Sequence, residues 1–284
     1  MEKSTAPTVD LGGGGVAMPR LGFGTWPMTG EAAEQAVGEA ISRGYRSIDT
    51  AAVYGNENSV GRGIAASGID RSDVFVTTKL ARTAHGYDTA LRAFEQSARE
   101  LATDYLDLYL IHWPMPALDL YVDSWRALIR LQSDGRVRAI GVSNFKPAHV
   151  DRLIEETGVV PAVNQIELNP RTNRADVRAY HERMGIVTES WAPLGSGTDL
   201  LAEPVLAELA TKYHKQPGQI VLRWHMELGL VATPRSANPQ RMSSNIDVFD
   251  FVLTEDEVQR ISALDTGSHP AVDSDTFVGP PAPD

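Results

Sequence analysis

The stretch Gly44–Glu57 reads GYRSIDTAAVYGNE, and its pattern predicts a strand followed by a polar loop. Gly44 is typical of a helix end, and the residues after it predict a short buried strand. Asp49 follows where this strand should stop, and Tyr54 precedes a turn of glycine and asparagine. Barrel proteins place such acidic groups at the carboxyl ends of their strands. On this stretch alone, an Asp49 that caps the next segment and a Tyr54 at the rim are equally good interpretations.

The composition excludes several classes of protein. The chain has 284 residues, of which 42% are hydrophobic and 22% charged, with no cysteine and a formal net charge of -11. This charge argues against nucleic acid or an anionic membrane as the main partner. The lack of cysteine excludes disulfides and a thiol nucleophile, and fits a reducing compartment, so we expect a cytoplasmic protein. Neither a secretory signal nor an apolar run of membrane-spanning length is visible.

Predicted strands and helices alternate along the chain. We expect a hairpin at Val9–Arg20, with glycines in its turn, and a short strand at residues 21–26. Further strands are predicted at residues 45–48, 74–79, 105–111, 137–142, 163–166, 186–190 and 230–233. Helices are predicted at residues 33–41, 59–66, 91–101 (capped by Asp88), 125–131, 147–156, 176–184, 204–212 and 217–228, with a last one opened by the capping box Thr254–Glu257.

About eight strands that are apolar throughout predict a parallel sheet with both faces covered. Eight strand–helix units in this length favour a closed (β/α)8 TIM barrel, an α/β fold, over an open doubly wound sheet. No change in composition divides the chain, so we expect one domain over residues 1–284. Residues 1–7 are expected to form a flexible tail and residues 266–284 an irregular one.

Polar side chains end successive predicted strands, roughly thirty residues apart: Asp49, Lys79, His112 and Asn144. Parallel neighbours lie about 4.8 Å apart, so these groups should share one small site. A Tyr phenol has a pKa near 10, and a neighbouring Lys79 ammonium, held by Asp49, should lower it. Tyr54 could then donate a proton to an oxygen that becomes an alkoxide, and His112 could orient that oxygen. These side chains suit the reduction of a carbonyl group. The hydride for that reaction must come from a cofactor, because no side chain can supply it.

A place for a phosphorylated cofactor follows the last strand, where Arg235, Ser236 and Arg241 supply two guanidinium groups and a hydroxyl. Trp191 offers a face for stacking a nicotinamide ring, although an isolated Trp is more often a packing residue. The pattern that begins at Gly61-Arg62-Gly63 lacks the preceding strand of a dinucleotide-binding motif, so we interpret it as a helix with chance glycines. No metal site is predicted, because His181-Glu182 lacks a second histidine. The remaining histidines are expected to be solvated or packed: His85, His149, His214, His225 and His269.

Over nearly its whole length the chain resembles the aldo-keto reductase family. The matching motifs are Gly24-Thr25-Trp26, Asp49-Thr50-Ala51, Tyr54-Gly55-Asn56-Glu57, Thr78-Lys79, His112-Trp113-Pro114, Gly141-Val142-Ser143-Asn144-Phe145, Asn164-Gln165, and Pro234-Arg235-Ser236 with Arg241 and Asn245. The resemblance implies a (β/α)8 barrel closed at its bottom by the N-terminal hairpin, a monomer, and NADPH as the cofactor. The segment Trp191–Gly195 is similar to the prokaryotic branch of 2,5-diketo-gluconate reductases.

The resemblance also implies roles for individual residues. Tyr54 would be the proton donor of a tetrad with Asp49, Lys79 and His112. Residues expected at the cofactor are Thr25, the carboxamide-binding Ser143, Asn144 and Gln165, the stacking Trp191, Leu194 and Ser196 at the pyrophosphate, and Thr233, Arg235, Ser236, Ala237, Arg241, Ser244 and Asn245 around the 2′-phosphate and adenine. Trp26 and Trp113 would line the substrate pocket, and the tail near Phe277 would rim the mouth.

Two residues depart from the family pattern. Arg235 stands where a lysine is usual, and its planar fork requires a different geometry from an ammonium. Ser244 stands where an acidic residue often contacts the adenine, so NADPH binding should be weaker. We expect an NADPH-dependent reductase of small aldehydes and ketones. An NADPH-binding redox sensor or docking subunit with little turnover, and a barrel hydrolase or isomerase with Asp49 as base, are the alternatives. Sugar ketones, methylglyoxal-like aldehydes and aromatic aldehydes all remain open as substrates.

Overall fold

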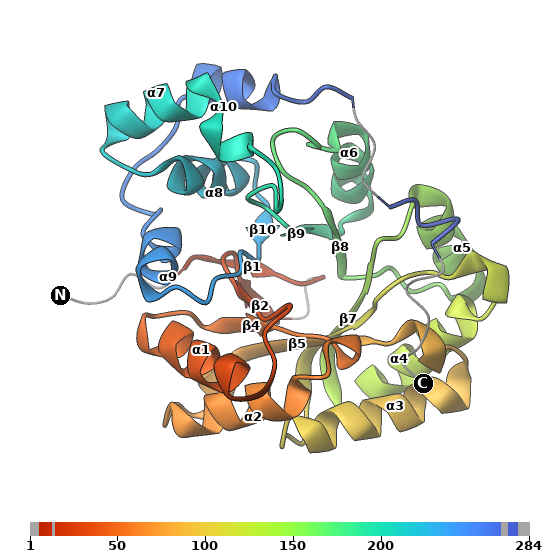
Figure 1. The fold of residues 1–284 in the computed structure, drawn as a ribbon. Coiled ribbons are helices and arrows are strands. Elements are labelled where there is room, and N and C mark those ends of the chain that lie inside the picture. The colour runs from red at the N-terminus through yellow and green to blue at the C-terminus, as the bar shows by residue number, and fades with distance from the viewer. Residues whose placement is uncertain (1–5, 13–14, 268–271, 278–284) are drawn as a thin grey trace.

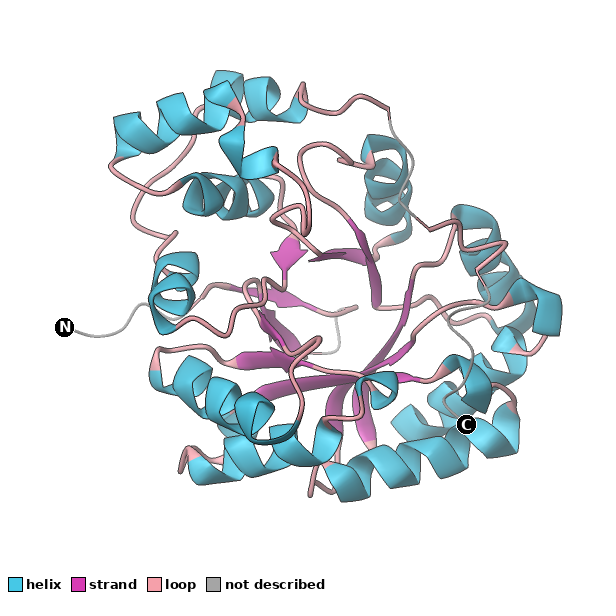
Figure 2. Cartoon of the chain, viewed as in Figure 1, coloured by secondary structure: helices cyan, strands magenta, loops and turns pink. Residues whose placement is uncertain are grey.

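The computed structural model describes residues 6–12, 15–267 and 272–277. Residues 1–5 of the expected N-terminal tail, part of the hairpin turn and most of the expected C-terminal tail therefore lie outside the described residues, as does His269. Eight parallel strands form the central sheet, and helices surround it (Figures 1 and 2). In sheet order they are β3 (Phe23–Gly24), β4 (Ser47–Asp49), β5 (Phe75–Leu80), β6 (Leu106–Ile111), β7 (Val137–Ser143), β8 (Val163–Glu167), β9 (Val187–Trp191) and β10 (Val231–Ala232).

The sheet closes into a barrel through contacts between its first and last strands. Parallel bridges pair Leu21 with Ala232 and Gly24 with Arg235. The Gly22 amide donates to the Ala232 carbonyl at 2.9 Å, and the Ala232 amide donates to the carbonyl of Arg20 at 2.9 Å. The predicted closed α/β barrel is therefore confirmed, since every neighbouring pair in the sheet is parallel.

The N-terminal hairpin pairs β1 (Thr8–Asp10) with β2 (Ala17–Pro19) in antiparallel register. Leu11 and Met18 of this hairpin are buried against Phe75, Leu108 and other side chains inside the barrel. Phe75 begins β5 and Leu108 lies early in β6, so the hairpin closes the end of the barrel where the strands begin. The opposite end, where the strands finish, is left for a site.

Ten α-helices are found among the described residues, and together they form the outer layer. They are α1 (Gly30–Ser42), α2 (Glu57–Ala66), α3 (Tyr87–Glu100), α4 (Tyr121–Ser133), α5 (Pro147–Thr157), α6 (Ala175–Met184), α7 (Pro204–Tyr213), α8 (Pro217–Glu227), α9 (Pro239–Ile246) and α10 (Glu255–Ser262). None of the helices in this part of the chain has the length and apolar character needed to cross a membrane.

Three details of the helices differ from or sharpen the predictions. The capping box of α10 is confirmed, because the Thr254 hydroxyl accepts from the Glu257 amide at 3.3 Å and the Glu257 carboxylate accepts from the Thr254 amide at 2.8 Å. The predicted cap of α3 is wrong: Gly86 is the cap, and Asp88 lies inside the first turn. The sequence analysis predicted no helix at α9, which carries few buried residues and so lacks a clear apolar face.

The interpretation of Gly61 and Gly63 as chance glycines is also wrong. Both lie in α2, as predicted, but a Cβ atom on Gly61 would lie 2.7 Å from the Leu101 carbonyl oxygen. A Cβ atom on Gly63 would lie 2.6 Å from the carbonyl oxygen of Glu34. Only glycine permits these close approaches of α2 to its neighbours, so both residues are required by packing.

Candidate active site

The four residues of the expected tetrad lie together at the carboxyl end of the barrel. Asp49 ends β4, Lys79 lies near the end of β5, and His112 follows β6 directly. Tyr54 ends the short 3-10 helix η1 (Ala52–Tyr54) on the loop after β4. The Lys79 ammonium donates to the Asp49 carboxylate at 2.6 Å and lies 5.3 Å from the centre of the Tyr54 ring. The Tyr54 and His112 ring centres are 5.8 Å apart.

Lys79 is fully buried and is held as an ammonium by Asp49. Burial alone would lower the pKa of Lys79, but the charge and the hydrogen bond of Asp49 raise it to about 12. The ammonium makes a further hydrogen bond to the Thr50 carbonyl at 2.9 Å. A buried charge with a close counterion and additional hydrogen bonds is stable and stays fixed in place. Lys79 can therefore present a constant positive charge to the phenol of Tyr54.

The sequence-based expectation for the Tyr54 pKa is wrong in its net direction. Burial raises the pKa of the phenol above its usual value, and the nearby Lys79 lowers it again by a smaller amount. The charge of Lys79 acts as expected, but removal of the phenol from water outweighs it. Tyr54 is consequently a protonated phenol at neutral pH, which is the form that can donate a proton.

His112 is a neutral imidazole at neutral pH. Burial, and then the charges of Lys79 and Arg82, hold the pKa of His112 well below its usual range. A neutral imidazole can donate one N–H to a polar oxygen without adding a second positive charge beside Lys79.

A hydrogen-bonded network continues from the tetrad to Trp191. The Gln165 side chain donates to Asp49 Oδ2 at 2.9 Å, and the Ser143 hydroxyl donates to the Gln165 carbonyl at 2.9 Å. The Asn144 amide donates to Ser143 Oγ at 3.0 Å, and the Trp191 indole donates to Asn144 Oδ1 at 2.9 Å. These are the residues that the resemblance assigned to the nicotinamide, and the structure brings them together beside the tetrad.

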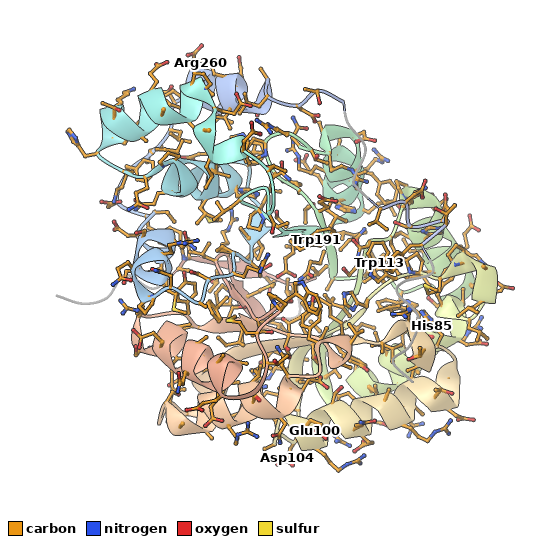
Figure 3. The ribbon with its side chains drawn as sticks, in the orientation of Figure 1. His85, Glu100, Asp104, Trp113, Trp191 and Arg260 are labelled. Carbon is orange, nitrogen blue, oxygen red and sulfur yellow. The ribbon has the colours of Figure 1, made fainter. Side chains whose placement is uncertain are left out.

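Aromatic side chains surround the phenol on the side that faces the mouth. Trp26 lies 5.0 Å from Tyr54 between ring centres and is 52% exposed, so an approaching molecule would meet it. Trp113 stacks on Phe277 of the C-terminal segment, with ring centres 4.0 Å apart. Both Trp113 and Trp191 lie within the ring of helices (Figure 3). Phe277 of the C-terminal segment is thus brought against the loop that follows β6.

The residues expected at the cofactor phosphates gather on the loops after β9 and β10 and on α9. Arg235 donates to Ser196 Oγ at 2.9 Å and so links the two loops. Arg235 and Arg241 are exposed, and neither forms an ion pair with a carboxylate among the described residues. The other members of this set differ in exposure: Ala237 and Ser196 are exposed, Leu194, Ser236 and Ser244 are half-buried, and Thr233 and Asn245 are buried. Thr25, which follows β3, is also buried.

His85, expected to be solvated or packed, is packed, and the structure adds Glu189, which the sequence patterns did not single out. His85 is buried, and its Nε2 donates to the Trp113 carbonyl at 3.0 Å, so it supports the loop after β6. Glu189 lies inside β9 and is fully buried. A charged residue in the middle of a predicted strand, two positions before Trp191, is the signal that could have identified it. Within the part of the chain that is described, no cluster of His, Asp or Glu could hold a metal ion.

Comparison with known proteins agrees with this geometry. Residues 20–266 match the Aldo/keto reductase family. The chain is 51% identical to an "Aldo-keto reductase" of Mycobacterium sp. (strain KMS), over 96% of this chain and 98% of that protein. It is 44% identical to "Methylglyoxal reductase DkgA" of Salmonella typhimurium (strain LT2), over 96% of this chain and 99% of that one.

A solved structure extends the comparison to a bound cofactor. A mutant of Gox0644 in complex with NADPH superimposes with a TM-score of 0.90 at 43% identity, covering 98% of this chain and 99% of that one. The family uses a nicotinamide cofactor, and the resemblance stated from the sequence motifs is confirmed. The chain belongs to the aldo/keto reductase family and is an oxidoreductase that acts on carbonyl groups.

Proposed function

We propose that this protein reduces small aldehydes and ketones to alcohols with NADPH, and that Tyr54 is the proton donor. The observation that carries the proposal is the position of the Tyr54 ring at the barrel mouth, with its centre 5.3 Å from the ammonium of the buried Lys79–Asp49 ion pair. A relative named for methylglyoxal reduction and a neighbour bound to NADPH support the same substrate class and cofactor.

The proton step follows from the charges around Tyr54. As a carbonyl oxygen becomes an alkoxide, the phenol transfers its proton to that oxygen and becomes a phenolate. The Lys79 ammonium stabilises this phenolate, because the two opposite charges lie close together in a water-poor site. Neutral His112 donates a hydrogen bond to the same oxygen and orients it toward the phenol.

The side chains beside the tetrad fit a nicotinamide. When bound, the cofactor supplies the hydride that reduces the carbonyl carbon. Ser143, Asn144 and Gln165 present hydroxyl and amide groups that suit a carboxamide, and Trp191 provides the stacking face. Thr25 closes the same side of the mouth, where its hydroxyl donates to the Asp49 carbonyl at 3.0 Å.

The exposed arginines fit the 2′-phosphate that distinguishes NADPH from NADH. Arg235 and Arg241 carry positive charge on the surface of an otherwise acidic chain, and guanidinium groups bind phosphates in bidentate fashion. Leu194 and Ser196 would border the pyrophosphate. The residues that would surround the 2′-phosphate and adenine are Thr233, Arg235, Ser236, Ala237, Arg241, Ser244 and Asn245. We also propose a single-domain, monomeric, cytoplasmic enzyme, as the family resemblance and the cysteine-free composition suggest.

A redox sensor that binds NADPH without useful turnover is the alternative function, and the complete tetrad argues against it. The two are separated by following NADPH absorbance in the presence and absence of methylglyoxal, a sugar ketone and an aromatic aldehyde. Consumption that depends on a carbonyl compound supports the enzyme. Tight NADPH binding without consumption across the whole panel would support the sensor.

A further inference from the structure

Glu189 points into the barrel, on the same side of β9 as Trp191. Successive residues of a strand face opposite sides of the sheet. The flanking hydroxyls face outward: Thr188 Oγ1 lies 2.9 Å from His181 Nδ1 on α6, and Ser190 Oγ lies 3.2 Å from His225 Nε2 on α8. Glu189 is therefore an interior residue. It lies two residues before Trp191 on β9, and so deeper in the barrel than the mouth of the site.

Glu189 is a buried carboxyl group without a hydrogen-bond partner. Its exposed fraction is 0%, and neither carboxyl oxygen has a partner within the described residues. Two hydroxyls on inward-facing positions elsewhere in the barrel share this condition, Ser47 on β4 and Thr77 on β5, two strands that pair with each other and not with β9. Moving an unpartnered carboxylate from water into such a place is strongly unfavourable, so burial favours the uncharged form of this group.

The neighbours of Glu189 connect it to the tetrad. Gln165 on β8 is its partner in the strand register, and the Gln165 side chain donates to Asp49 at 2.9 Å. Val231 is its partner on β10 and carries no charge. Burial, and then the charge of Asp49, raise the pKa of Glu189 to about 8, while the nearby Gln165 amide and then the charge of Lys79 oppose the shift. In return, a charged Glu189 raises the pKa of Tyr54 and of Lys79.

We propose that Glu189 is a positioning residue of the tetrad, which must be uncharged for efficient proton transfer from Tyr54. In its neutral form it packs against Gln165 and leaves Asp49 as the single counterion of Lys79. If Glu189 loses its proton, two carboxylates share one ammonium. The phenolate that Tyr54 must become is then less well stabilised, and Tyr54 is a weaker acid.

The protonation state can be tested without any substrate, by infrared spectroscopy. A protonated carboxyl group has a C=O stretching band that is absent from carboxylates. We expect this band in the intact protein at pH 7, its loss on titration through pH 8, and its absence from Glu189→Gln. Identical spectra of the parent and Glu189→Gln at pH 7 would overturn the proposal. Glu57→Gln is the matched control, because Glu57 on α2 is also a buried acid whose pKa is raised by burial, and its carboxyl group accepts from Thr78 on β5, away from β9.

The kinetic consequence can be tested by the pH profile of carbonyl reduction, and this arm rests on the proposed function. Glu189→Gln keeps the size of the side chain and is neutral at every pH. We expect kcat of Glu189→Gln to stay within about threefold of the parent at pH 7. The ratio of the variant to the parent should rise to at least about threefold at pH 9, where roughly nine-tenths of a group with this pKa is charged.

The outcomes separate this proposal from the proposed function. Superimposable pH profiles, with both proteins active, would overturn the role of Glu189 and leave the reductase intact. A loss of more than about a hundredfold at pH 7 would mean that a charged Glu189 is needed, which also overturns the proposal. If Glu189→Gln does not fold, the parent and Glu57→Gln are compared instead. A protonated-carboxyl band that both proteins lose between pH 7 and pH 10 supports the proposal, and a band that is missing from Glu57→Gln overturns it. If no carbonyl compound is reduced by either protein, the proposed function fails while the infrared result stands.

Discussion

Replacement of Lys79 by methionine removes the charge at the centre of the site while keeping a side chain of similar length. Lys79 is fully buried, and its ammonium lies 2.6 Å from Asp49. The variant leaves the Asp49 carboxylate buried with no counterion, and breaking a buried pair in this way costs about 3–5 kcal/mol of unfolding free energy. The rate should fall as well, because loss of the ammonium raises the pKa of Tyr54 further. General acid catalysis contributes about 10²–10⁴-fold, so we expect kcat to fall by roughly 10²–10³-fold.

Both effects can be measured on the same preparation, by denaturant unfolding and by stopped-flow decay of NADPH absorbance with methylglyoxal. Arg130→Met is the matched control, because Arg130 pairs with Asp134 at 2.7 Å but its side chain is 61% exposed. We expect the control to change the unfolding free energy by less than about 1 kcal/mol. A Lys79→Met protein that unfolds at the same denaturant concentration as the parent, with its rate retained, would refute the electrostatic reasoning for the site.

Three other predictions concern the cofactor, the packing and the response to acid. Arg241→Ala should weaken NADPH by at least about tenfold and leave NADH nearly unchanged in fluorescence titrations, because it removes a charge-assisted bond to the 2′-phosphate; equal weakening of both would exclude this role. Gly61→Ala should lower the unfolding free energy by about 1–3 kcal/mol through its clash with Leu101, whereas Gly218→Ala, whose nearest contact is 3.9 Å, should be neutral or slightly stabilising. Burial lowers the pKa of His225 to about 4, so the native state resists protonation that the unfolded state accepts below about pH 6.5. Stability should therefore fall as pH drops from about 6.5 toward 4, and less steeply in His225→Asn; equal slopes in urea titrations would contradict the assignment.

The parts of the fold that the sequence predicts are those in which local pattern and tertiary structure agree. Asp49, Lys79 and His112 each follow an apolar strand at regular spacing, and a closed parallel barrel brings all such positions to one end. The capping box at Thr254 needs no partner outside its own helix, so local pattern is sufficient to predict it.

The parts that the sequence does not predict depend on contacts between distant residues. Helix α9 buries little apart from Met242 and Asn245, and the Tyr45 hydroxyl holds it by donating to the Met242 carbonyl at 3.0 Å. Gly61 is required only because Leu101, forty positions further along the chain, lies against it. The pKa of Tyr54 depends on how much water the assembled barrel excludes, a quantity that residue spacing does not contain. The lack of a hydrogen-bond partner for the Glu189 carboxyl group likewise depends on how the barrel interior packs, which the sequence alone does not show.

The central proposal is that Tyr54 supplies the proton, and single-turnover reduction by Tyr54→Phe with NADPH already bound tests it most directly. This variant keeps the ring that contacts Trp26 and His112 and removes only the hydroxyl. We predict that NADPH affinity stays within about threefold of the parent, while the rate of methylglyoxal reduction falls by roughly 10³-fold. A variant that binds NADPH normally and keeps most of its rate would contradict the account.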